Sequence, residues 1–147
     1  MTKTIKPVHI LLVEDNDGDV LLITEALEEK KIVSKISVVR NGEQAIDFLE
    51  KKGDYQQVLQ PDLILLDINL PRKNGHEVLQ YIKETEYLKQ IPVIMLTTSS
   101  SESDVLKSYK NHANCYITKP VDVDNFLKAV TSIEEFWISL VQLPPNE

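Results

Sequence analysis

Residues 61–75 read PDLILLDINLPRKNG, and the four consecutive apolar residues in this stretch, at positions 63–66, stop at Asp67. An uninterrupted apolar run of this length is typical of a strand that is covered on both faces of a sheet. Pro71 and Gly75 follow and indicate a loop before the next element. The stretch therefore places a carboxylate at the end of a buried strand, where the ordinary explanations are a helix cap or a turn.

Short apolar runs of this kind alternate with stretches that have apolar residues at helical spacing. Strands that alternate with helices predict an α/β, doubly wound fold, in which a five-stranded parallel sheet carries helices on both faces. No internal repeat or linker divides the 147 residues, so we expect one domain over residues 1–147. The predicted strands are residues 8–13, 36–39, 62–67, 92–97 and 115–118. The predicted helices are residues 20–29, 42–52, 75–84, 102–110 and a last one from about 123.

The composition argues against several classes of partner. The chain has 16 Lys and Arg against 23 Asp and Glu, a net charge of −7, and its basic residues are scattered. Binding to nucleic acid needs clustered basic side chains, so we expect no nucleic-acid partner. No apolar run approaches the roughly 18 residues of a membrane-spanning helix, and no signal-peptide pattern opens the chain. The single cysteine, Cys115, permits no internal disulfide, and we expect a cytoplasmic protein without a membrane partner.

Polar side chains follow four of the five predicted strands. In a parallel sheet of this kind, the carboxyl ends of the strands meet at one edge, where ligands bind. We therefore expect three carboxylates, a hydroxyl and an ammonium to lie together, with an asparagine two residues beyond the third carboxylate. The residues concerned are Glu14, Asp15, Asp67, Asn69, Thr97 and Lys119.

Carboxylates that lie close together resist ionisation because they repel one another, and a divalent cation removes that conflict. Mg²⁺ prefers oxygen ligands, which Asp15, Asp67 and a loop carbonyl near Asn69 could supply. A metal beside a carboxylate, with the ammonium of Lys119 and the hydroxyl of Thr97 nearby, suits phosphoryl transfer. Asp67 could be the nucleophile that forms an acyl phosphate. Each residue alone has an ordinary structural explanation, so the prediction depends on their conjunction at the ends of four different strands.

Four segments of the chain carry motifs of a known family. They read VEDNDGD (13–19), LLDINLPRKNG (65–75), IMLTTS (94–99) and YITKP (116–120), and they resemble the motifs of bacterial response-regulator receiver domains. The resemblance runs from about residue 8 to residue 130. It implies a flavodoxin-like (βα)5 fold with strand order 2-1-3-4-5. It also implies a phosphoacceptor that assists its own phosphorylation and dephosphorylation, and not an ordinary enzyme.

The resemblance implies a role for each residue at the strand ends. Asp67 resembles the residue that accepts a phosphoryl group from a histidine kinase, and Thr97 and Lys119 resemble the catalytic residues that engage that group. Thr97 and Tyr116 resemble the pair that switches conformation. The bond between Lys119 and Pro120 resembles the cis peptide of the family. The residues that resemble the Mg²⁺ ligands are Glu14, Asp15, Asp67 and, through its backbone carbonyl, Asn69.

The chain continues beyond the usual end of a receiver domain near residue 130. Apolar residues keep helical spacing from Val123 to Val141, so the sequence predicts an extended C-terminal helix that ends before Pro144. Phe136 and Trp137 on this helix either fold back on the core of the chain or form an apolar interface. Spacing alone does not decide between the two.

A narrower resemblance favours the interface. The segment GDYQQVLQPDLILLDINLPRKNG (53–75) and the tail EEFW (134–137), followed by LP (143–144), resemble the single-domain response regulators that pair with cyanobacterial phytochromes. This implies a light-regulated, phytochrome-type histidine kinase as phosphodonor and a homodimer formed through residues 131–147. The interface would include Phe136, Trp137 and Leu140. The sequence does not identify the downstream partner.

Three alternatives stay open at this point. A phosphohydrolase would use Asp67 as nucleophile, but the haloacid type needs a second aspartate two residues later, and Asn69 cannot shuttle a proton there. A degenerate receiver would bind partners without phosphate, and the complete set of site residues argues against it. A flavodoxin-like flavin or nucleotide binder would hold a phosphate near the first strand, where the acidic EDNDGD (14–19) would repel it.

Overall fold

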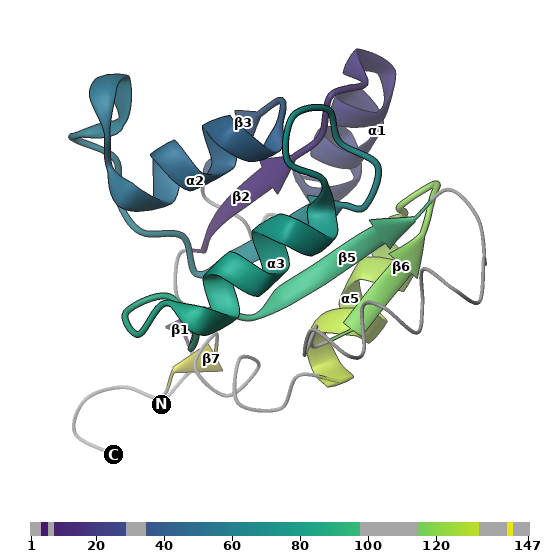
Figure 1. Cartoon of the computed structure of the whole chain (residues 1–147). Helices are drawn as coiled ribbons and strands as arrows, with labels where there is room; N and C mark the ends of the chain where they lie inside the picture. Colours follow the sequence, from purple (N-terminus) through teal and green to yellow (C-terminus); the bar gives the residue numbers. More distant parts are fainter. Residues whose placement is uncertain (1–3, 6–7, 29–34, 98–114, 133–140, 143–147) are drawn as a thin grey trace.

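Five parallel strands form the central sheet of the computed structural model, which describes residues 4–5, 8–28, 35–97, 115–132 and 141–142 (Figure 1). They lie in the order β3-β2-β4-β5-β6. Counted along the chain within this sheet, the order is 2-1-3-4-5, which confirms the prediction. The strands are β2 (His9–Val13), β3 (Lys35–Val39), β4 (Leu63–Asp67), β5 (Val93–Thr97) and β6 (Cys115–Thr118).

The helices lie between and after these strands, close to the predicted positions. The helix expected at residues 102–110 lies outside the described residues. The bond between Lys119 and Pro120, just after β6, is cis, as predicted. Within the described ranges, no helix has both the length and the apolar character that crossing a bilayer requires. The helices are α1 (Asp17–Glu28), α2 (Gly42–Glu50), α3 (Gly75–Glu84) and α5 (Val123–Ser132), with a short 3-10 helix, η1 (Gly53–Tyr55).

The first helix begins earlier than its apolar spacing predicts. Asn16 caps it, because its side-chain oxygen accepts the N–H of Asp19 at 2.9 Å and its backbone carbonyl accepts the N–H of Val20 at 3.0 Å. The first turn of α1 is therefore built from polar residues, with Asp17 and Asp19 near the positive end of the helix dipole. Hydrophobic spacing alone does not detect a turn of this kind.

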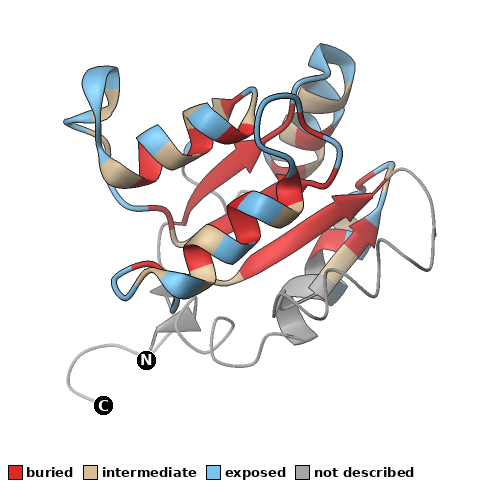
Figure 2. Ribbon diagram, in the orientation of Figure 1, coloured by how far each residue is buried: buried red, intermediate tan, exposed pale blue. Residues whose placement is uncertain are grey.

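Alternate residues of the central strands β2, β4 and β5 bury their side chains on opposite faces of the sheet. On one face, residues such as Ile10 and Leu12 pack with α1 and α5, and on the other, Leu11 and Val13 pack with α2 and α3. The two pairs of helices lie on opposite sides of the sheet (Figure 1). Every residue of β2, β4 and β5 is buried (Figure 2). Full burial of a Val, Leu or Ile side chain contributes roughly 1.5–3 kcal/mol to stability. Two covered faces explain why these strands are apolar at consecutive positions.

The C-terminal region departs in part from the prediction. The structure describes α5 as far as Ser132, and residues 133–140, which include Phe136, Trp137 and Leu140, lie outside the described residues. The helical spacing predicts that Val141 lies on the same helix, and this is wrong. Val141–Gln142 form β7, which pairs antiparallel with β1 (Thr4–Ile5). The physical reason is the pairing with β1, since the backbone groups of Val141 and Gln142 bond across the two strands instead of within a helix.

Candidate functional site

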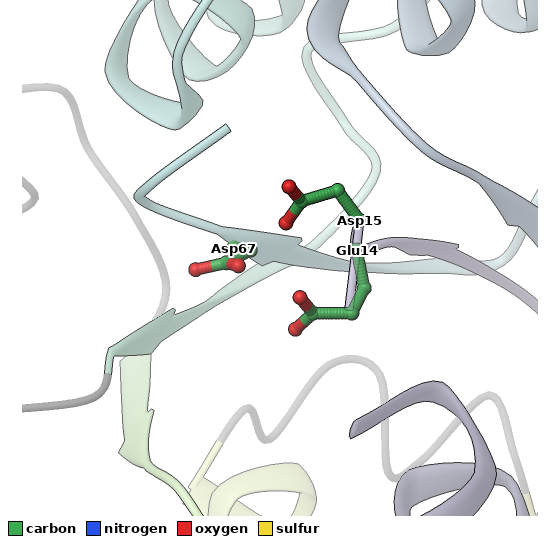
Figure 3. A group of neighbouring side chains, drawn as sticks. All are labelled: Glu14, Asp15 and Asp67. Carbon is green, nitrogen blue, oxygen red and sulfur yellow. The ribbon is translucent and has the colours of Figure 1, made fainter. Parts of the chain in front are cut away.

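Three carboxylates meet at the carboxyl ends of β2 and β4 (Figure 3). Glu14 and Asp15 follow β2 directly, and Asp67 is the last residue of β4. The register pairs Val13 with Leu66, so the residues that follow them are neighbours. One oxygen from each of the three carboxylates lies within 4.8 Å of the other two. The structure thus brings together the three acidic residues on which the sequence prediction depends.

Glu14 is the most deeply buried of the three. Its backbone N–H donates to the carbonyl of Val39 at 3.0 Å, which continues the pairing with β3 and turns the side chain inward, where its exposed fraction is 0%. One carboxylate oxygen accepts the N–H of Asn16 at 3.2 Å. Burial raises the pKa of Glu14 to about 7, while the ammonium of Lys119 opposes the rise and the charge of Asp67 adds to it. A carboxylate in this position needs a cation beside it.

Lys119 supplies a cation from the chain just beyond β6. Its backbone N–H donates to the carbonyl of Thr97 at 2.7 Å, which fixes the start of the side chain at the same edge of the sheet. Its ammonium nitrogen forms ion pairs with Glu14, with Asp19 at 3.0 Å and with Asp67 at 3.3 Å. Burial alone would lower the pKa of Lys119, but its acidic partners outweigh burial and raise that pKa above its ordinary value. The side chain is therefore a cation at neutral pH.

The loop after β4 holds Asp67 in place. The N–H of Ile68 donates to the carbonyl of Leu96 at 3.0 Å, and the N–H of Asn69 donates to a carboxylate oxygen of Asp67 at 3.2 Å. Gly75, the first residue of α3, donates its N–H to the carbonyl of Ile68 at 2.9 Å. A Cβ at position 75 would lie 2.3 Å from the carbonyl oxygen of Asp67, so only glycine allows the helix to approach the site this closely.

Thr97 and Tyr116 lie on the two strands beyond Asp67. Thr97 ends β5, is 1% exposed and pairs in register with Thr118, which immediately precedes Lys119. Tyr116 is half-buried on β6 and packs against the core on the α2 and α3 face. Thr97 thus lies at the edge of the sheet that carries the carboxylates, and Tyr116 lies on the strand that leads to Lys119.

A cavity of about 470 Å³ opens beside the carboxylates on the side of the β4–α3 loop. Asp15, the exposed member of the three, lines it together with Asn69, so the cavity gives a hydrated ion access to both residues. The residues that line it are Asp15, Ile68, Asn69, Leu70, Pro71, Asn74 and His76.

The donor set fits a divalent cation. When ionised, Glu14, Asp15 and Asp67 carry three negative charges with oxygens within 4.8 Å of one another, and Lys119 compensates one of them. All three side chains offer hard oxygen donors, which suit Mg²⁺, Mn²⁺ and similar ions. Asp15 and Asp67, with the backbone carbonyl of Asn69, would hold the ion most directly, and Glu14 lies behind them.

Asp19 is a site residue that the sequence prediction missed. Its carboxylate contacts Lys119 at 3.0 Å, closer than the 3.3 Å contact between Lys119 and Asp67. It was missed because residues 14–19 were interpreted as an acidic loop and not as the first turn of a helix. The spacing of Asn16 and Asp19, three residues apart before an apolar run, is the capping pattern that would have placed Asp19 on α1.

Comparison with known proteins identifies the family to which the chain belongs. The family model described as the response regulator receiver domain matches residues 10–131. The chain is a response-regulator receiver domain. A relative, the response regulator Rcp1 of Synechocystis sp., is 46% identical over 138 residues, which cover 94% of each chain.

Solved structures of related receiver domains agree with the fold. The bacteriophytochrome response regulator RtBRR is 44% identical with a TM-score of 0.81, covering 95% of this chain and 86% of that one. The phosphorylated cyanobacterial phytochrome response regulator RcpA is 46% identical with a TM-score of 0.77, covering 95% and 99%. The Mn²⁺-bound form of Rcp1 is 46% identical with a TM-score of 0.76, covering 94% and 99%.

Membership of the receiver family settles the class of activity. This receiver domain is a phosphoacceptor and not a classical enzyme, which removes the phosphohydrolase and the flavin binder as alternatives. A histidine kinase is the partner that its homology implies. The acidic cluster supports a divalent metal ion at the site, and the related Rcp1 binds Mn²⁺ in its structure.

Proposed function

We propose that this receiver domain accepts a phosphoryl group on Asp67 from a phytochrome-type histidine kinase and then presents a changed surface to a downstream partner. Its relatives include the cyanobacterial phytochrome response regulator RcpA and the bacteriophytochrome response regulator RtBRR, which supports the pairing with a phytochrome kinase. Because such kinases take the phosphoryl group from ATP, the proposal places the protein in the cytoplasm.

The single observation that carries the proposal is the position of Asp67. Its carboxylate ends a buried strand, lies among the oxygens of Glu14 and Asp15, and receives a hydrogen bond from the ammonium of Lys119 at 3.3 Å. A carboxylate between a metal-binding cluster and a fixed cation is arranged for attack on phosphorus, since phosphoryl transfer depends mainly on positioning and on stabilising charge.

In the proposed reaction, a carboxylate oxygen of Asp67 forms a bond to the phosphorus of a phosphohistidine. The phosphorus–nitrogen bond breaks, its electron pair returns to the imidazole nitrogen, and that nitrogen regains a proton from solvent. Lys119 stabilises negative charge on the phosphoryl oxygens, and the hydroxyl of Thr97 donates a hydrogen bond to one of them. A bound Mg²⁺ would neutralise part of the charge on the same oxygens.

Phosphorylation would change the surface through Thr97 and Tyr116. The phosphoryl group adds roughly −1.5 to −2 charges and three acceptor oxygens. When Thr97 moves toward it, the space that the threonine leaves allows Tyr116 to turn inward from its half-buried position. The signal is then a population shift between two conformations, and its size is limited by the difference in affinity of the phosphoryl group for them.

The proposal also includes a homodimer. In it, residues 8–130 form the core of a single receiver domain, and the extension at residues 131–147 forms the contact through Phe136, Trp137 and Leu140. Burial of two aromatic side chains of this kind, roughly 150–250 Å² each, contributes several kcal/mol at ~25 cal/mol per Å². Sedimentation of a chain that lacks residues 134–147 tests this: a folded monomer is expected, and a stable dimer would contradict it.

Intact-mass measurement with acetyl phosphate and Mg²⁺ tests the phosphorylation itself. We expect a gain of one phosphoryl group per chain, lost in Asp67→Asn but retained in the control Asp54→Asn, an exposed aspartate in η1. Transfer from a purified phytochrome-type kinase, compared in light and in darkness, tests the donor. Labelling of Asp67→Asn at the wild-type level would refute Asp67 as the acceptor.

A further inference from the structure

The ammonium of Lys119 already faces three carboxylates before any phosphoryl group arrives. An ammonium has three N–H donors. The nitrogen of Lys119 contacts three carboxylates, those of Glu14, Asp19 and Asp67. A phosphoryl oxygen that engages Lys119 must therefore displace one of these three acceptors.

The three acceptors differ in what they lose when Lys119 turns away. The side chains of Glu14 and Asp67 are 0% and 4% exposed, so either one would be left as a buried charge without its cation. The side chain of Asp19 is 33% exposed and can exchange its bond to Lys119 for bonds to water. Asp19 is consequently the acceptor that Lys119 gives up at the lowest cost.

We propose that Asp19, which faces the ammonium of Lys119 from the first turn of α1, is a positioning residue for the phosphorylation of Asp67. It holds one N–H of Lys119 while Asp67 is unmodified and releases it to the phosphoryl group. This inference rests on the proposed function of Asp67. In this role Asp19 opposes phosphorylation, because its contact with Lys119 stabilises the unphosphorylated state. The strength of that contact influences how strongly the site binds a phosphoryl group.

The local structure fixes Asp19 in this position. Its backbone N–H donates to the capping side chain of Asn16 at 2.9 Å, so the first turn of α1 is held by the backbone of Asp19 and not by its carboxylate. Replacement of that carboxylate therefore leaves the helix cap in place. Asp17 occupies the same turn but pairs with Arg40, and its side chain is 86% exposed. Asp17 is accordingly a matched control for the loss of one negative charge.

Binding of beryllium trifluoride (BeF₃⁻), which attaches to an aspartate oxygen in the place of a phosphoryl group, tests the inference. The dissociation constant is measured by calorimetry or ¹⁹F NMR at saturating Mg²⁺. For Asp19→Asn we expect a roughly three- to tenfold lower constant than for the wild type, because a neutral amide competes for Lys119 more weakly than a carboxylate. Asp19→Glu, which keeps the charge, is expected to restore the wild-type value, and Asp17→Asn to stay within about twofold of it.

The outcomes separate this inference from the proposed function. Binding to Asp19→Asn that equals binding to Asp17→Asn, or is weaker than wild-type binding, would overturn the role of Asp19. A wild-type protein that binds no BeF₃⁻ would instead overturn the proposed phosphorylation of Asp67. Thermal melts verify that each variant folds, and Asp19→Ala, which also keeps the backbone cap, replaces Asp19→Asn if that variant does not.

Discussion

Replacement of Gly75 by alanine should damage the site more than the fold. A Cβ at this position would lie 2.3 Å from the carbonyl oxygen of Asp67 and 2.7 Å from the Cα of Ile68, and both neighbours are backbone atoms. To reach even 3.0 Å from the oxygen, the shortest distance that real Cβ atoms show, the two segments must separate by about 0.7 Å. Val78 and Leu79 anchor α3 in the core, so the displacement falls on the end of β4, at Asp67, and on the loop that follows it.

The magnitude follows from that displacement. Overpacking of this kind costs roughly 1–3 kcal/mol, and the better helix propensity of alanine offsets less than about 1 kcal/mol. The melting temperature should fall by roughly 2–4 °C for each kcal/mol that remains. A reacting group displaced by about 1 Å can lose on the order of 100-fold in rate. We therefore expect the phosphorylation of Asp67 to slow by about tenfold or more in Gly75→Ala.

The assay compares the initial rate of mass gain from acetyl phosphate with the melting temperature of the same samples. The control is Gly53→Ala, because Gly53 has a φ of +56° but no atom within 4 Å of its Cβ position. Backbone strain in Gly53→Ala should cost about 1 kcal/mol of stability and leave the rate unchanged. A Gly75→Ala protein that is phosphorylated as fast as Gly53→Ala would refute the close approach as the reason for this glycine.

Two further predictions concern stability. Burial lowers the pKa of His9 below its ordinary 6.5, so the unfolded chain binds a proton before the folded chain does. The free energy of unfolding is therefore highest above pH 6.5 and decreases as the pH falls below it. In urea unfolding, the free energy lost between pH 8 and pH 5 should be smaller for His9→Gln than for the wild type, and equal losses would contradict this. The hydroxyl of Tyr81 donates to Glu50 at 2.5 Å, so Tyr81→Phe should lose about 1 kcal/mol in urea unfolding, whereas Tyr55→Phe should lose less.

The fold was largely predictable because its strands are buried on both faces. A run such as residues 63–66 has no polar position, and a run of this length bounded by Asp62 and Asp67 is typical of a buried strand. Two-residue strands such as Thr4–Ile5 and Val141–Gln142 carry no such pattern. Their pairing joins segments far apart in the chain, so local sequence spacing could not reveal it.

The sequence predicted which residues lie at the site but not all of the contacts between them. Topology alone brings Glu14, Asp67 and Lys119 to one edge, since each ends or directly follows a parallel strand of the same sheet. The contact between Lys119 and Asp19 depends on where α1 begins, and the cap at Asn16 sets that start. Had α1 begun at residue 20, as its apolar spacing predicts, position 19 would precede the helix and nothing would fix its carboxylate. The cap therefore connects the start of a helix to the charge that competes for the site's lysine.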